Sequence, residues 1–173
     1  MKIVLIGYMG SGKSTLGKAL SDKLNYTFKD LDTEIELKEE INIATIFSEK
    51  GEIYFRKKEN EVLRNIIATQ NQIVLATGGG TPCYGTVMDY LKESDDVVTV
   101  YLKTSLDVLT ERLYSEKEKR PLISHLESKE KLQDFIRKHL FERLFVYNKA
   151  ALVISVDNKD VSKVVEELVL KLF

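Results

Sequence analysis

The stretch that decides the fold is GYMGSGKST, residues 7–15. It matches the pattern G-x-x-x-x-G-K-[ST] in full, and it lies between an apolar run, Lys2–Ile6, and an amphipathic stretch of helical periodicity. In this arrangement the glycines let successive backbone N–H groups face one anion, and the following helix adds the partial positive charge of its N-terminus. A glycine-rich turn that fits the pattern by chance would need neither the strand nor the helix. The stretch therefore predicts a phosphate-binding loop, or P-loop.

The P-loop contains groups for both the phosphates and a metal ion. Lys13 can reach the β- and γ-phosphates of a nucleotide, and the hydroxyl of Ser14 can bind Mg²⁺. One cysteine, Cys83, and two histidines, His125 and His139, are too few for a zinc cluster, so we expect a hard cation held by oxygen atoms. The loop residues expected to bind the nucleotide are Gly10, Ser11, Gly12, Lys13, Ser14 and Thr15.

Length and charge exclude several classes of protein. The 173 residues suffice for one α/β domain, residues 1–173, and are too few for two ordinary domains. The net charge of -1 provides no global positive field for nucleic acid or an anionic membrane. The opening apolar run is far too short for a signal peptide or a membrane span, and the single cysteine excludes an internal disulfide. We therefore expect a cytoplasmic protein with small-molecule partners, no nucleic acid and no membrane. We also expect a monomer, although length and charge do not determine the oligomeric state.

Short β-branched runs alternate with longer amphipathic stretches along the chain. This alternation implies right-handed β-α-β crossovers and a parallel sheet with helices on both faces. In such sheets ligands bind at the carboxyl ends of the strands. The runs expected to form strands are residues 2–6, 26–31, 73–76, 97–102 and 152–156.

Two carboxylates end the second run, in the sequence FKDLD, residues 28–32. If the strand continues through them, alternation places Asp30 and Asp32 on the same side, about 7 Å apart. One could then hold hydrated Mg²⁺ while the other orients the hydroxyl of an acceptor. Asp32 is also well placed to cap a helix that begins with TEIE, residues 33–36. The local pattern alone slightly favours the interpretation of Asp32 as a helix cap.

Three consecutive glycines, Gly78, Gly79 and Gly80, follow the third run. After a buried strand they suggest a close approach of the backbone to a ligand, and a plain turn is the alternative. The stretch FRKKE, residues 55–59, is less informative, because an arginine such as Arg56 in a charged helix is usually solvated.

A helical pattern is expected over residues 134–149. His139, Arg143 and Tyr147 recur there every four residues and so share a face. The ordinary interpretation of Arg143 is a solvated arginine paired with a neighbour such as Glu142 or Glu130, a pair that would contribute little to stability.

Taken in order, these motifs resemble those of the shikimate kinase family, and the resemblance covers nearly the whole chain. It rests on the P-loop, Asp30-Leu31-Asp32, Phe55-Arg56 with Glu59, the three glycines, Arg120-Pro121-Leu122, and Arg143 with Tyr147. It implies a three-layer α/β P-loop kinase fold with a central parallel five-stranded sheet, a substrate-binding helical region at about residues 33–60 and a mobile lid at about residues 112–124. The charged stretch 115–120 has no apolar anchor, which also suggests mobility around residues 115–124.

The resemblance implies an activity and a set of roles. The activity is ATP-dependent phosphorylation of the 3-hydroxyl of shikimate, a step of chorismate and aromatic amino-acid biosynthesis, with ATP as co-substrate and one Mg²⁺ per subunit. Asp30 would hold Mg²⁺ through water alongside Ser14, and Asp32 would act as the base or positioning group for the attacking hydroxyl. The implied catalytic residues are Lys13, Asp32 and Arg120. The implied substrate-binding residues are Asp32, Arg56, Gly78, Gly79, Gly80 and Arg143, with Phe47, Phe55 and Glu59 shaping the pocket. Outside the P-loop, the implied ATP-binding residues are Arg112, Arg120 and Asn158.

Two other functions are compatible with a P-loop. A gluconate-kinase-like enzyme would act on an acceptor that is also both an acid and a polyol, but the triple glycine and the sequence Arg120-Pro121-Leu122 favour shikimate. A nucleotide-dependent switch protein would need guanine recognition, usually by Asn-Lys-x-Asp. The sequence Asn158-Lys159-Asp160 lacks the spacer residue and lies very late in the chain.

Overall fold

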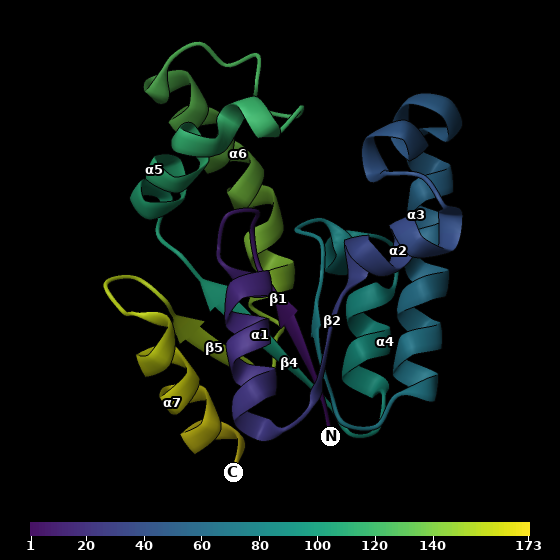
Figure 1. The fold of residues 1–173 in the computed structure, drawn as a ribbon. Helices are drawn as coiled ribbons and strands as arrows, with labels where there is room; N and C mark the ends of the chain where they lie inside the picture. The colour runs from purple at the N-terminus through teal and green to yellow at the C-terminus, as the bar shows by residue number, and fades with distance from the viewer.

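The computed structural model describes residues 1–118 and 120–173, and its centre is a parallel five-stranded sheet in the order β2-β3-β1-β4-β5. Every neighbouring pair of strands runs parallel, as Figure 1 shows. The strands are β1 (Lys2–Ile6), β2 (Thr27–Asp30), β3 (Ile73–Ala76), β4 (Val97–Lys103) and β5 (Leu152–Ser155). The predicted α/β class and parallel sheet are confirmed.

Helices cover both faces of the sheet. The α-helices are α1 (Lys13–Leu24), α2 (Leu31–Glu39), α3 (Ile43–Thr69), α4 (Val87–Glu93), α5 (Leu106–Glu116), α6 (Lys129–Tyr147) and α7 (Val161–Leu172), and two short 3-10 helices are η1 (Thr81–Cys83) and η2 (Lys117–Lys119). Alternation along β1 sends Ile3 and Leu5 into the core shared with α1 and α7. It sends Val4 and Ile6 into the core shared with α3, α4, α5 and α6. The strand is therefore buried on both sides, which explains its continuous apolar sequence.

Some helices and strands begin or end at other residues than predicted. The second strand ends at Asp30 rather than at Leu31, because Leu31 is the first residue of α2. The helix predicted over residues 134–149 begins earlier, at Lys129, where the hydroxyl of Ser128 accepts a hydrogen bond from the Lys131 N–H and caps it. In α3, Gly51 has non-helical backbone angles and divides the helix at a kink.

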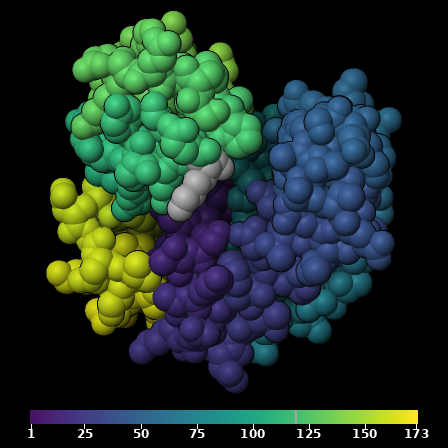
Figure 2. All heavy atoms as spheres, turned by 45° about the horizontal axis from the view of Figure 1, so that its top comes forward, coloured from purple at the N-terminus to yellow at the C-terminus, as the bar shows by residue number. Residues whose placement is uncertain are grey.

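The carboxyl ends of the strands lie at one edge of the sheet, where the P-loop, the end of β2 and the glycines after β3 come together. Two arms rise on either side of this edge in Figure 1, one formed by α5, η2 and part of α6 and the other by α2 and the first part of α3. Figure 2 shows the two arms standing apart above α1. Among the residues that the structure describes, no helix is both long and apolar enough to cross a membrane.

Candidate active site

A cavity of about 510 Å³ opens at this edge of the sheet. Its lining comes from the P-loop and α1, from the ends of β2 and β3, from the end of α5, and from the segment around β5 and α7. The residues that line it are Met9 to Leu16, Asp30, Asp32, Thr77, Gly78, Gly79, Arg112, Ser115, Glu116, Arg120, Val156, Lys159, Val161 and Val164. Predicted nucleotide-binding and catalytic residues from segments far apart in the sequence therefore meet in one cavity.

The P-loop leaves its polar groups directed at this cavity. Gly12 precedes α1 with φ 92°, a left-handed conformation that favours glycine, and no described side chain caps the helix there. The first N–H groups of α1 are thus free to bind an anion. The ammonium of Lys13 donates to the carbonyls of Gly7 (2.8 Å) and Tyr8 (2.9 Å). Burial lowers the pKa of Lys13 to about 8, against the opposing effect of Asp32 and Asp30, so it remains largely protonated at neutral pH.

Asp30, and not Asp32, caps helix α2. The Asp30 Oδ1 atom accepts a hydrogen bond from the Asp32 N–H (3.1 Å), so the interpretation of Asp32 as the cap is wrong. The alternation argument is also wrong, because Asp32 lies in the first turn of a helix rather than on a strand. Both carboxylates nevertheless line the cavity, because the strand-to-helix turn directs them to the same place.

The environment of Asp32 is suited to proton transfer. Burial raises the pKa of its carboxyl to about 6, with further contributions from Asp30 and Glu59, and the charge of Lys13 acts in the opposite direction. A group with this pKa is mostly ionised at neutral pH and is more basic than an ordinary aspartate. It can therefore accept a proton from a hydroxyl.

Ser14 and Asp30 offer oxygen ligands for a hard cation. The Ser14 hydroxyl donates to Asp30 Oδ2 at 2.6 Å, so the two groups lie side by side on the cavity wall. Within the described residues no group of three or more His, Cys, Asp or Glu side chains could hold a metal ion. Such a sparse oxygen set fits Mg²⁺, which usually keeps several waters and takes further ligands from substrate phosphates.

The glycines after β3 allow side chains to approach the backbone closely. A Cβ atom at Gly80 would lie 2.6 Å from an Arg56 guanidinium nitrogen, and one at Gly78 would lie 3.0 Å from the Thr81 hydroxyl oxygen. Neither position leaves ordinary room for a side chain, so the plain-turn interpretation does not explain this segment. Gly78 and Gly79 line the cavity, and the absence of a side chain at Gly80 leaves room for the guanidinium of Arg56.

Arg56 is held in place by a carboxylate rather than by solvent. Its Nη1 donates to Glu59 Oε2 (2.8 Å), and Glu59 Oε1 accepts a hydrogen bond from the Thr81 hydroxyl (2.6 Å). Only 15% of the Arg56 side chain is exposed. The solvated interpretation of this arginine is wrong.

Arg143 lies on the inner face of α6. Its Nη1 donates to the carbonyl of His139 (2.9 Å) and only 19% of its side chain is exposed, with Glu142 at the outer limit of an ion pair (3.8 Å). Burial raises the pKa of the Cys83 thiol, and the charges of Arg143 and Arg56 both act in the opposite direction. Helices α3 and α6, which carry these two arginines, both pack against η1.

The predicted lid contributes two arginines to the cavity. Arg112 belongs to the last turns of α5 and donates to the carbonyl of Gly10 (3.1 Å), and Arg120 pairs with Glu116 (3.0 Å). The expectation that residues 115–124 lack an apolar anchor is wrong, because Ile123, just beyond the charged stretch 115–120, is fully buried against the core and Leu126 packs against the same core. Lys119 of the same stretch lies outside the described residues.

Asn158, which is predicted to bind ATP, belongs to the loop of residues 157–160, and this loop lies beside the cavity. Of its described residues, Lys159 lines the cavity and Asn158 does not. The Asp157 carboxylate accepts hydrogen bonds from the Ser105 N–H (3.1 Å) and so fixes the loop to the start of α5. The role of Asn158 in ATP binding stays a prediction.

Comparison with known proteins identifies the family. The model of the family described as shikimate kinase matches residues 9–173. A shikimate kinase of Flavobacterium psychrophilum is 46% identical over 167 residues, 96% of each chain. The chain belongs to the shikimate kinase family. Among solved structures, that of a shikimate kinase from Bacteroides thetaiotaomicron is similar with a TM-score of 0.90 at 35% identity, over 99% of this chain and 98% of that one. A shikimate kinase from Acinetobacter baumannii, solved in complex with shikimate, is similar with a TM-score of 0.84 at 31% identity, over 99% and 92% of the two chains.

Membership of the shikimate kinase family confirms the resemblance seen in the sequence and the enzyme class. It also decides against the gluconate-kinase-like and switch interpretations. The sequence argument missed Thr81, which fixes Glu59, and the hydrogen bond between Tyr8 and His139. A threonine beside three glycines and a histidine four residues before Arg143 were visible, but nothing local indicates their partners.

Proposed function

We propose that the protein transfers the γ-phosphoryl group of ATP to the 3-hydroxyl of shikimate, which gives ADP and shikimate 3-phosphate in aromatic amino-acid biosynthesis. The observation that carries this proposal is the position of Asp32, which lines the same cavity as the P-loop and lies against Gly78 beside Glu59. A hydroxyl held there would stand between a proton acceptor and the phosphate site. The Acinetobacter baumannii relative in complex with shikimate supports the choice of acceptor.

Phosphoryl transfer needs positioning and charge neutralisation more than covalent help. We assign the phosphates to the N-terminus of α1, to Lys13 and to Arg120, with Arg112 and Asn158 on the nucleotide. Ser14, and Asp30 through water, would hold one Mg²⁺ per subunit, which supplies charge neutralisation when bound. The residues of the P-loop and lid would then exclude water from the transferring group.

The acceptor site has opposite charges at its two ends. Shikimate carries one carboxylate and three hydroxyls, so it suits guanidinium groups at one end and a carboxylate at the other. Arg56 and Arg143 would bind its carboxylate, and Asp32 and the backbone of Gly79 and Gly80 would bind its hydroxyls. We further propose that the protein is a single-domain monomer of the cytoplasm, where ATP is supplied. Its acceptor region would span about residues 33–60 and its mobile lid about residues 112–124.

The proposed function is tested by ADP release from ATP and Mg²⁺ with shikimate, with gluconate or without an acceptor. We expect release that depends on shikimate, together with shikimate 3-phosphate as the product. Equal release with and without shikimate, or transfer to gluconate alone, would contradict the proposal.

The Lys13→Ala variant is expected to weaken ATP binding and turnover together. Lys13 supplies the buried positive charge nearest the P-loop carbonyls, and its removal takes charge from the β/γ-phosphate site. Calorimetric titration with a non-hydrolysable ATP analogue and steady-state kinetics measure the two effects. Lys18→Ala, a change of the same type on the exposed side of α1, is the matched control and is expected to leave both unchanged. Normal ATP affinity in Lys13→Ala would contradict the assignment.

The Arg143→Ala variant is expected to raise the KM for shikimate at least about tenfold with little change in the KM for ATP. A charge-assisted hydrogen bond to a carboxylate contributes about 1.5–3 kcal/mol, which corresponds to one to two decades in affinity. Arg143→Lys should restore only part of the affinity, because an ammonium cannot make the planar two-point contact. Steady-state kinetics with each substrate varied in turn provide the measurement. An unchanged dependence on shikimate would remove Arg143 from the carboxylate site.

A further inference from the structure

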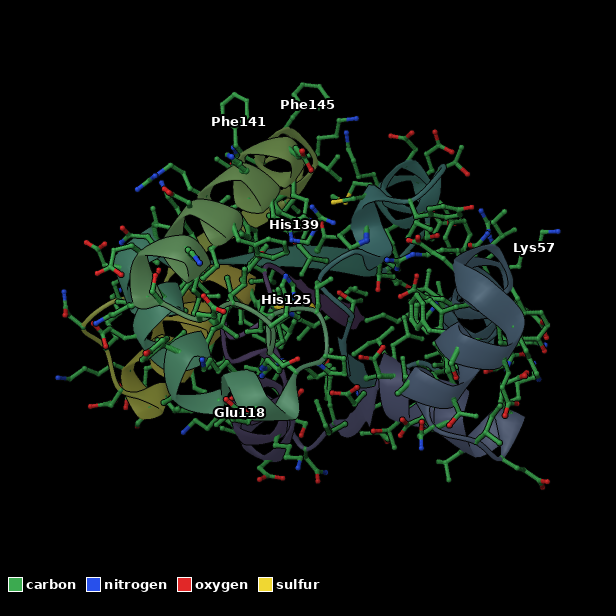
Figure 3. All side chains as sticks on the ribbon, turned by 90° about the horizontal axis from the view of Figure 1, so that it is seen from above. Lys57, Glu118, His125, His139, Phe141 and Phe145 are labelled. Carbon is green, nitrogen blue, oxygen red and sulfur yellow. The ribbon has the colours of Figure 1, made fainter. Side chains whose placement is uncertain are left out.

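Helix α6 is fixed to the rest of the site on both sides of Arg143. One turn after it, the Tyr147 hydroxyl donates to the carbonyl of Gly79 at 2.6 Å. One turn before it, His139 Nδ1 lies 2.8 Å from the Tyr8 hydroxyl, and the two rings meet edge to face with centroids 5.5 Å apart. Figure 3 shows His139 pointing inward from α6, while Phe141 and Phe145 of the same helix point away from the molecule. Arg143 therefore lies between two fixed points.

The contact with Tyr8 connects α6 directly to the P-loop. Tyr8 is buried, and its carbonyl accepts a hydrogen bond from the ammonium of Lys13. Its hydroxyl bonds the side chain of His139, whose carbonyl in turn accepts from the guanidinium of Arg143. A short path of hydrogen bonds thus runs from the phosphate-binding loop to the arginine assigned to the acceptor carboxylate.

The protonation states favour this hydrogen bond. Burial lowers the pKa of His139, and the charge of Arg143 lowers it further, so the ring is neutral at neutral pH. Burial raises the pKa of Tyr8 well above its ordinary value, so the hydroxyl keeps its proton. When the imidazole carries its proton on Nε2, the hydroxyl donates to Nδ1.

We propose that His139 and Tyr8 form a positioning pair that fixes the guanidinium of Arg143 at a set distance from the P-loop. By fixing Arg143, the pair would hold the carboxylate of the acceptor molecule in one place. The reacting hydroxyl of the same molecule would then lie in line with the phosphoryl group. Neither residue touches the reacting atoms, and both act through Arg143. This inference rests on the proposed function, because it assumes that Arg143 binds a substrate carboxylate.

Loss of one neutral hydrogen bond corresponds to about a two- to tenfold change in affinity. Tyr8→Phe keeps the ring and removes only the hydroxyl, and His139→Leu removes the acceptor. Each is expected to raise the KM for shikimate about two- to tenfold, and the double variant should be no worse than the single ones, because both remove the same bond. His139→Asn should recover most of the affinity, since its amide oxygen can occupy the place of Nδ1.

Two further variants separate positioning from stability. In an Arg143→Ala background, His139→Leu should cause no additional rise in the KM for shikimate. Phe141→Ala, on the exposed face of the same helix, should leave the kinetics of the wild-type protein unchanged. Thermal unfolding of every variant shows whether it is folded at the assay temperature.

The outcomes are distinguishable. An unchanged KM for shikimate in Tyr8→Phe, or additive effects in the double variant, would overturn the positioning pair while the wild-type activity stands. A folded wild-type protein that does not phosphorylate shikimate would overturn the proposed function and the inference together.

Discussion

Asp32→Asn is expected to reduce kcat by about 10²- to 10⁴-fold while the affinity for ATP stays near its wild-type value. The physical reason is that an amide cannot accept the proton of the attacking hydroxyl, although it has nearly the shape of the carboxylate. The fold should be unaffected, because Asp30 and not Asp32 caps α2. Single-turnover kinetics separate the chemical step from product release.

The matched control is Glu34→Gln, which makes the same change of charge on the same helix outside the cavity lining. It is expected to retain wild-type turnover. If Asp32→Asn also retains near-normal turnover, Asp32 is neither the base nor the group that positions the hydroxyl.

The same assignment predicts a pH dependence. Because burial raises the pKa of Asp32 to about 6, the carboxylate is ionised above that pH and is protonated as the pH falls through it. Turnover should therefore decrease as the pH falls below about 6. Well below that pH, the decrease should reach about tenfold per pH unit. Carbon-13 NMR of the side-chain carboxyl should show a titration near pH 6 in the free protein. A titration near pH 4, the ordinary range, would contradict the raised pKa.

The parts of the fold that depend on local pattern were predicted well from the sequence. The first and third strands have their predicted bounds, because β-branched apolar runs between polar residues leave little freedom in placing them. The P-loop was equally clear, since its spacing follows from the chemistry of phosphate binding. The end of β2 could not be predicted in the same way, because Asp30 and Asp32 are both good capping residues. Only the position at which the helix begins decides which of them is the cap.

Long-range contacts could not be predicted from the residues alone. Arg56 and Arg143 lie in helices whose local charge pattern indicates solvent exposure, and only the family resemblance assigned them to the site. Ile123 was overlooked as an anchor because it lies just beyond the charged stretch 115–120, although it packs into the core. Tyr8 and His139 are separated by 131 positions, so no local signal connects them.

The Arg120→Ala variant is expected to reduce kcat by about 10²- to 10³-fold, with a much smaller effect on the KM for shikimate. Arg120 lines the cavity, and its charge is close enough to oppose protonation of Lys13, so it lies within electrostatic reach of the phosphate site. Its Nε atom is buried and has no hydrogen-bond partner among the described residues, which leaves a donor for an anion. Its Nη2 atom is paired with Glu116.

Charge that develops on the transferring phosphoryl group would draw Arg120 away from Glu116, so the interaction is strongest in the transition state. An interaction of that kind changes kcat more than ground-state binding. Arg120→Lys should recover part of the turnover by restoring the charge without the planar fork. Arg137→Ala, which removes an exposed arginine of α6 outside the cavity lining, is the matched control and should behave as wild type. A rise in the KM for shikimate with unchanged kcat in Arg120→Ala would instead make Arg120 a ground-state binding residue, because the arginine would then contribute equally before and during phosphoryl transfer.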